Sequence, residues 1–190
     1  KSGGSIEFQP SATTRFVLDS NSRISLGNND SGGDTTNTVF GRLAGANIAS
    51  GGINNTVFGS EAGNDISTGD KNTLIGYLAG DKLSTTSQNV VIGSAAGRGA
   101  GYADNVYIGY AVANSTSSNS SNNTLIGSGV AMSGAMSGGD NTAVGKAALA
   151  AITSGTNNIA IGMSALTANN TASNNVAIGK NSMLSITDGQ

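Results

Sequence analysis

One asparagine-to-glycine pattern recurs nine times along the chain, and it restricts the possible folds more than any other feature. Its glycines are spaced 16 to 18 residues apart and stand at positions 41, 59, 76, 93, 109, 127, 145, 162 and 179. Each is preceded four residues earlier by an asparagine and directly by phenylalanine, isoleucine or valine, as in Asn72-Thr73-Leu74-Ile75-Gly76. A fixed period of this kind indicates a protein built from stacked structural repeats.

The length of the period determines which repeat is possible. Sixteen to eighteen residues are too few for a pair of helices, but they suit one coil of a β-solenoid with two short strands and two turns. The segment before each glycine is rich in β-branched residues, which favour strands. We therefore expect an all-β fold, a parallel β-roll or β-solenoid of about nine 16–18-residue coils.

Two apolar columns flank each other within the expected strand. The residue two places before each glycine is apolar, as is the one directly before it, and strand neighbours point to opposite faces. Both faces should therefore be covered, one by the coil itself and the other by a further surface. We expect the column directly before the glycine, which includes Ile92, to lie in a thin dry core, and Ser94 to face outward.

A small residue, usually alanine, stands three places after the glycine and implies that the coil is thin. A thin coil buries few apolar side chains, at roughly 1.5 to 3 kcal/mol each. That barely offsets about 1 to 2 kcal/mol per residue for ordering the backbone. Self-association of the chain would supply the missing burial.

Two repeat motifs carry a resemblance to known proteins. Asn158-Ile159-Ala160-Ile161-Gly162 and Asn175-Val176-Ala177-Ile178-Gly179 resemble the repeat of trimeric autotransporter adhesin heads, which implies a left-handed parallel β-roll in a homotrimer. The longer form Gly-x-Asn-Asn-Thr-x-Ile-Gly-x-x-Ala-Gly is similar to repeats of trimeric phage tail fibres. The likeness covers residues 37–183. The adhesin repeat is usually shorter, so the present repeats imply longer outer loops.

Composition excludes several classes of function. The chain has 9 basic and 11 acidic residues and a net charge of -2, so it lacks the excess of basic residues expected of a nucleic-acid-binding surface. It contains neither histidine nor cysteine, and its acids are dispersed, so we expect no enzyme, no catalytic residues, no metal site and no cofactor. No apolar run is long enough for membrane insertion.

The chain is expected to form two parts. Residues 1–30 stand apart as an N-terminal β cap or connector, in which 22–27 resembles a degraded repeat. A hinge to an upstream shaft is the alternative. Residues 31–190 form the β-roll repeat domain, and its pattern stops mid-repeat, so we expect the native chain to continue.

The most regular polar column is expected to be structural. Stacked amides about 4.8 Å apart can hydrogen-bond along the stack. The column predicts a structural ladder of Asn37, Asn55, Asn72, Asn89, Asn105, Asn123, Asn141, Asn158 and Asn175.

A receptor-contact patch is predicted at Arg98, Tyr102, Asp104 and Tyr110, because aromatic and charged side chains on an exposed face suit sugar stacking. The alternative is that Tyr102 merely covers a turn.

An oxygen-rich segment at 29–34 fits a turn better than a calcium loop. Threonine fills about half of the column three places before the glycine, and an ice-binding face is therefore a minor alternative.

The resemblance to tail-fibre repeats implies a non-enzymatic structural segment of a phage tail fibre, located in the virion and serving as a rigid shaft or head for host attachment. The partners expected are two further copies of the chain and a host surface glycan or outer-membrane receptor. The alternatives are a trimeric adhesin head on the bacterial surface and a polysaccharide-depolymerising tail spike.

Overall fold

The computed structural model describes residues 36–99, 103–115, 120–132, 136–168 and 170–184, together with two short strands at 17–18 and 24–25. These residues form strands and turns, with no helix among them. The strands are β1 (Val17–Leu18), β2 (Ile24–Ser25), β3 (Thr38–Phe40), β4 (Thr56–Phe58), β5 (Thr73–Ile75), β6 (Val90–Ile92), β7 (Val106–Ile108), β8 (Thr124–Ile126), β9 (Thr142–Val144), β10 (Ile159–Ile161) and β11 (Val176–Ile178).

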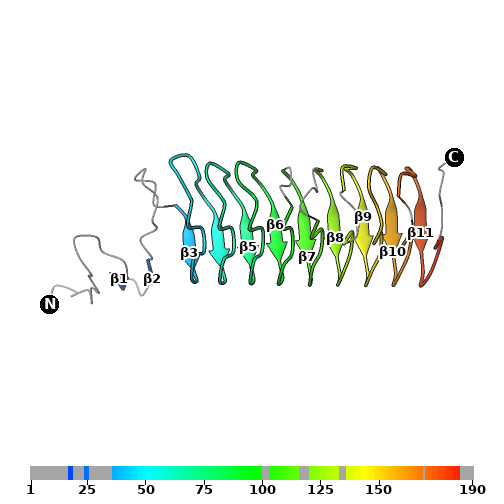
Figure 1. Ribbon diagram of the computed structural model, residues 1–190, viewed down its shortest axis with the longest axis horizontal. Coiled ribbons are helices and arrows are strands. Elements are labelled where there is room, and N and C mark those ends of the chain that lie inside the picture. Colours follow the sequence, from blue (N-terminus) through cyan, green and yellow to red (C-terminus); the bar gives the residue numbers. More distant parts are fainter. Residues whose placement is uncertain are drawn as a thin grey trace.

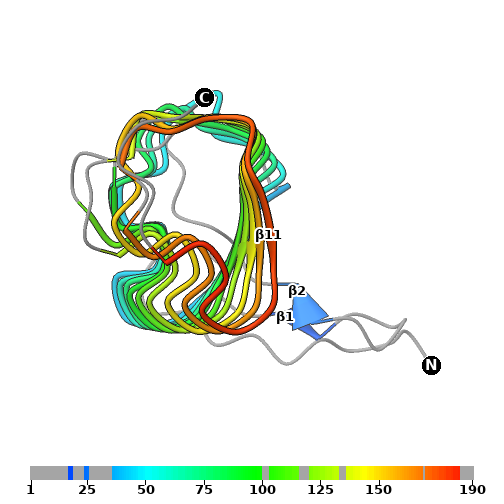
Figure 2. The same ribbon diagram turned by 90° about the vertical axis from the view of Figure 1, so that its right-hand side faces the viewer.

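Strands β3 to β11 form one parallel sheet in sequence order, one strand per coil (Figure 1). The register pairs equivalent repeat positions, so Thr73 lies beside Val90 and Ile75 beside Ile92. Viewed along the axis, the coils superpose, and the chain runs clockwise as it advances toward the viewer (Figure 2). The expected β-solenoid is therefore confirmed, with left-handed coils, in contrast to the right-handed crossovers that most parallel sheets use.

The N-terminal strands belong to a different sheet. Strands β1 and β2 pair antiparallel with each other, with Val17 opposite Ser25, and they do not join the nine-stranded sheet. Strand β2 therefore does not add a further parallel strand, as a degraded repeat would. The remainder of the expected cap at 1–30, and the segment 29–34, lie outside the described residues.

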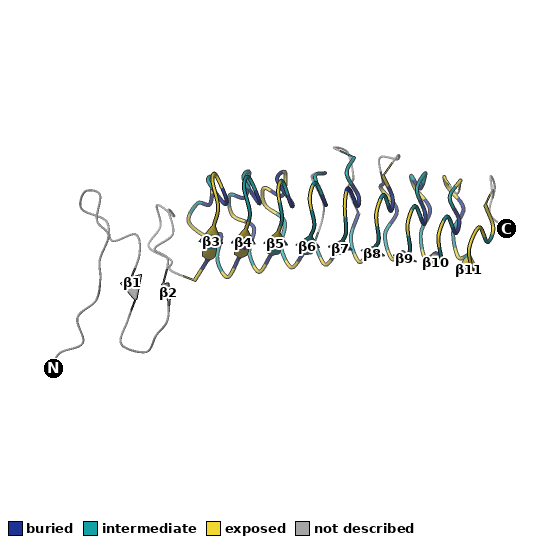
Figure 3. Cartoon of the chain, turned by 90° about the horizontal axis from the view of Figure 1, so that it is seen from below, coloured by how far each residue is buried: buried dark blue, intermediate teal, exposed yellow. Residues whose placement is uncertain are grey.

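In each strand from β4 to β11 the middle residue is buried and the two residues beside it are more exposed (Figure 3). The buried residue is the one two places before the glycine, such as Leu74 or Val91. Ile92, directly before its glycine, lies on the outer face and is only half-buried. The expectation that its column lies in the dry core was therefore wrong for the single chain, because residues one place apart in a strand face opposite ways.

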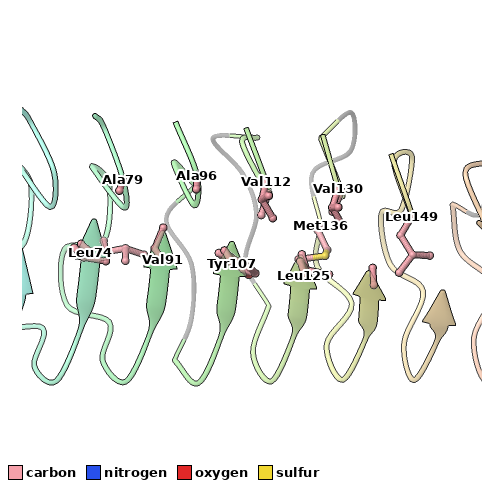
Figure 4. Close-up of a cluster of buried hydrophobic side chains, with 14 of the residues drawn as sticks. Leu74, Ala79, Val91, Ala96, Tyr107, Val112, Leu125, Val130, Met136 and Leu149 are labelled. Atoms are coloured by element: carbon pink, nitrogen blue, oxygen red, sulfur yellow. The ribbon is translucent and has the colours of Figure 1, made fainter. Parts of the chain in front are cut away.

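The small column three places after the glycine forms the opposite wall of the coil. Ala79 and Ala96 are fully buried and lie across from the strands that carry Leu74 and Val91 (Figure 4). A third buried column, seven places after the glycine, completes the interior of four coils and was not recognised from the sequence. It consists of Ile48, Ile66, Leu83 and Ile152.

Two interior columns compensate each other in volume. In the coils of β3 to β6, where the strand residue is valine or leucine, glycine stands four places after the column glycine: a Cβ on Gly80 would lie 2.9 Å from a methyl of Leu74. The coils of β7 and β8, with Tyr107 and Leu125 in the strand, carry alanine there. In the coils of β9 and β10 the strand residue shrinks to Ala143 or Ala160, and Leu149 or Leu166 fills the space instead. The volume lost from one column is thus replaced by the other, as the close packing of protein interiors requires.

The column glycine allows the coils to stack closely. Gly76 has φ +131, and a Cβ there would lie 2.7 Å from the carbonyl carbon of Gly93 in the next coil. Side chains rarely adopt this backbone conformation and would also collide with the neighbouring coil. The glycine is therefore required at both the turn and the coil contact.

Candidate functional site

The nine asparagines form a continuous hydrogen-bonded ladder through the stack. Each backbone N–H from Asn55 to Asn175 donates to Oδ1 of the asparagine one coil earlier, at 2.8 to 3.2 Å. From Asn72 onward, Nδ2 donates to the same oxygen at 3.0 to 3.3 Å. The eight asparagines from Asn37 to Asn158 are buried, and their side-chain amides are used in hydrogen bonds within the stack.

The asparagines also close individual coils. Nδ2 of Asn72 donates to the carbonyl of Thr86 at 2.9 Å, and Nδ2 of Asn158 donates to the carbonyl of Ala172 at 2.9 Å. Each bond joins the start of a strand to the last turn of the same coil. One side chain therefore holds its own coil closed and fixes the next coil in register.

Arg98, the first residue of the predicted patch, is held by a buried carboxylate. Its Nε lies 3.3 Å from Oδ1 of Asp81, and its Nη2 lies 3.4 Å from Oδ2. Asp81 is only 4% exposed, so the guanidinium compensates a charge that burial would otherwise destabilise. Arg98 is therefore engaged in an ion pair within the fold, with an acidic residue one coil earlier in the stack.

Two further residues of the predicted patch flank strand β7. Asp104 and Tyr110 are exposed, but they lie at opposite ends of β7, with Asp104 before the strand and Tyr110 after its glycine. The three-residue strand lies between them, with a bend on either side. Tyr102 lies outside the described residues. The contact patch of these four residues therefore stays a prediction.

The outer face of the long sheet is an apolar surface that follows the whole stack. It comprises the first and third residues of each strand, including Phe40, 56% exposed, and Ile178, 68% exposed. Phe40 and Phe58 stack with ring centroids 5.1 Å apart and planes 10° apart. The threonines of the suggested ice-binding column share this face with bulky apolar neighbours. None of the eighteen positions is charged.

The column directly after the glycines is the second exposed surface. Tyr77 and Tyr110 stand in it with Ser94 between them, and all three are exposed, as predicted for Ser94. Backbone hydrogen bonds keep the column in register, from Ala95 N–H to Tyr77 O at 2.8 Å and from Ala111 N–H to Ser94 O at 3.0 Å.

Some ionisable groups in the described coils take part in inter-coil contacts or lie in the core. Nζ of Lys82 donates to Asp65 Oδ2 at 2.7 Å, and this bond raises the pKa of Lys82. Burial raises the pKa of Tyr107 strongly, against the opposing effect of its hydrogen bond with Ser120. The described part of the chain contains no group of three or more acidic, histidine or cysteine residues placed to hold a metal ion.

No family model, curated protein or solved structure matches this chain. Its function must be argued from its own surfaces. Within the described residues, no helix has the length and apolarity needed to cross a membrane. Two surfaces remain without an assigned partner: the apolar outer face of the sheet and the column after the glycines.

Proposed function

We propose that the chain is a rigid segment of a homotrimeric surface fibre, a shaft or head that supports attachment of a phage tail fibre to its host. The observation that carries the proposal is the uncharged apolar face that extends over β3 to β11. A soluble monomer rarely exposes an apolar surface of this extent. The face calls for a partner surface of equal length.

A further copy of the same chain is the partner that fits. It offers a face of the same length, the same inter-strand spacing and the same absence of charge. Closed symmetry brings identical patches of several copies together without leaving an open end. Three copies around one axis would bury the face and leave the turns and the column after the glycines outside.

A stack held by the asparagine ladder suits a mechanical role. Every coil is tied to the next through side-chain and backbone hydrogen bonds, so the segment maintains a straight, stiff shape. Three identical outer surfaces repeat any weak contact along the rod, and repeated contacts gain by multivalency. The same properties would serve a bacterial trimeric adhesin head, which is the alternative within this class.

Light scattering tests the assembly. We expect a folded species of about three times the 18.6 kDa chain mass. A stable folded monomer would contradict the proposal. Attachment of labelled protein to candidate host cells tests the biological role, and release of oligosaccharide from host capsule would instead support the depolymerising tail spike.

A further inference from the structure

Serine and tyrosine alternate in the exposed column after the glycines, over five consecutive coils. A basic residue stands at either end of this run. In coil order the column reads Arg42, Ser60, Tyr77, Ser94, Tyr110, Ser128 and Lys146. The interior core does not require this order, because Tyr77 is 53% exposed and Tyr110 is 64% exposed. Neither phenolic hydroxyl has a hydrogen-bond partner among the described residues.

The fold sets the distance between the two tyrosines. They lie two coils apart, and inter-coil backbone bonds hold positions 77, 94 and 110 in register. At about 4.8 Å per coil, their Cα atoms are about 10 Å apart. Phe40 and Phe58, in adjacent coils, show how rings of one column stack here, with centroids 5.1 Å apart and nearly parallel planes.

Ser94 interrupts the column where a third ring would stand. Two stacking steps of 5.1 Å, as between Phe40 and Phe58, would place one ring midway between Tyr77 and Tyr110. Because the side chain of Ser94 is small and exposed, we expect that position to be open. We define the Tyr77–Ser94–Tyr110 slot as the space bounded by these three residues.

The dimensions of the slot favour a puckered ring. Two carbon contacts of about 4 Å account for about 8 Å of the 10 Å separation, leaving about 2 Å for the pucker of the inserted ring. A pyranose chair fits between the two rings, and its axial C–H bonds project from both faces into the remaining space. The π faces of the tyrosines carry partial negative charge and attract those C–H bonds. A planar ring would fill the slot less completely.

The polar groups of the slot match the rim of a sugar. Ser94 offers a hydroxyl that donates and accepts at the floor, and the two phenols each offer another. No charged residue occupies the three positions. We propose that the Tyr77–Ser94–Tyr110 slot binds a neutral hexopyranose unit of a glycan. The proposal deepens the proposed attachment function, on which it rests for the glycan's origin at the host surface.

Affinity electrophoresis tests the slot with defined probes: native gels that contain dextran, mannan or galactan. We expect the wild-type protein to be retarded by at least one of them. Ser94→Tyr places a ring in the slot and should weaken retardation roughly tenfold, although it adds aromatic surface. Tyr77→Ser and Tyr110→Ser should each weaken it, because each removes one stacking face.

Ser128→Tyr is the matched control, since it adds the same ring beyond Tyr110 and leaves the slot open. It should retain retardation, and circular dichroism should show unchanged thermal unfolding for all four variants. The proposal is overturned if no matrix retards the wild-type protein, or if Ser94→Tyr binds as well as wild type. Light scattering and cell attachment are separate measurements, so a failed slot remains distinguishable from a failed fibre function.

Discussion

The backbone N–H of Asn141 donates a hydrogen bond of 3.0 Å to Oδ1 of Asn123, one coil earlier in the stack. Nδ2 of Asn141 donates to the same oxygen at 3.2 Å. The carbonyl oxygen of one side chain therefore satisfies a backbone donor and a side-chain donor of the next coil, in a position that water does not reach.

Replacing Asn123 by alanine should destabilise the fold markedly. The substitution leaves the buried N–H of Asn141 without its acceptor, which costs about 1 to 3 kcal/mol. Asn175→Ala is the control: Asn175 is the last of the nine and is only partly buried, so its loss should cost less. Chemical denaturation of both variants measures the difference. Equal losses would show that the ladder contributes no more inside the stack than at its end.

Aspartate substitutions at Val91 and Ile92 should separate the inside of the coil from its outside. Val91 is fully buried, so Val91→Asp places an unpaired carboxylate in the core at a cost of several kcal/mol and should prevent folding. Ile92→Asp should leave the single chain folded but abolish assembly through the apolar face. Circular dichroism reports folding and light scattering reports mass. A folded Val91→Asp protein would contradict the inward direction of this column.

The volume exchange between Leu74 and Gly80 should be measurable as a coupling. Leu74→Ala alone opens a cavity and should cost about 2 to 5 kcal/mol. Gly80→Leu alone would collide with Leu74. The double variant reproduces the Ala143 and Leu149 arrangement, and φ at Leu149 is 49°, which shows that leucine is accommodated there. We expect the double variant to be more stable than either single one, and additive losses in a double-mutant cycle would contradict the exchange.

Alkaline pH should destabilise the fold through Tyr107. Because burial raises the folded-state pKa of Tyr107 above its unfolded value near 10, its contribution is fully present below about pH 10 and is lost as pH rises. The loss should approach about 1.4 kcal/mol per pH unit above that point. Tyr107→Phe should remove this part of the dependence, whereas Tyr77→Phe, at an exposed position, should retain it. Urea unfolding between pH 8 and 11 provides the measurement.

The period of the sequence was sufficient to predict the coils, because one glycine per coil is required where Gly76 and Gly93 approach each other. The period was not sufficient to predict which residues of the strand face the core. Val91 and Ile92 are both apolar, and hydrophobicity alone does not distinguish a residue that faces its own core from one that faces outward. The exchange of volume between the strand residue and the residue four places after the glycine, which is Gly80 in one coil and Leu149 in another, was also missed. Its signal in the sequence is that these two columns vary together.

Closeness in sequence, on which the predicted contact patch rests, is a poor guide to neighbours in this fold. Arg98, Asp104 and Tyr110 are close in sequence, but a strand and two turns of a coil separate them. In a solenoid, residues one period apart are neighbours, so Tyr77 and Tyr110 share a surface although 33 positions separate them. The sequence signal for the proposed Tyr77–Ser94–Tyr110 slot therefore lies in a column of equivalent repeat positions and not in one contiguous segment.

The hydrogen bonds between coils lie along the length of the rod, and this direction determines its response to tension. A load along the axis opens contacts between adjacent coils, so an overloaded segment would unwind from an end, coil by coil. Seventeen residues released from one coil span about 55 Å when extended, against about 4.8 Å in the stack. A single chain would therefore extend about elevenfold as it unwinds, dissipating the load as an extensible tether does.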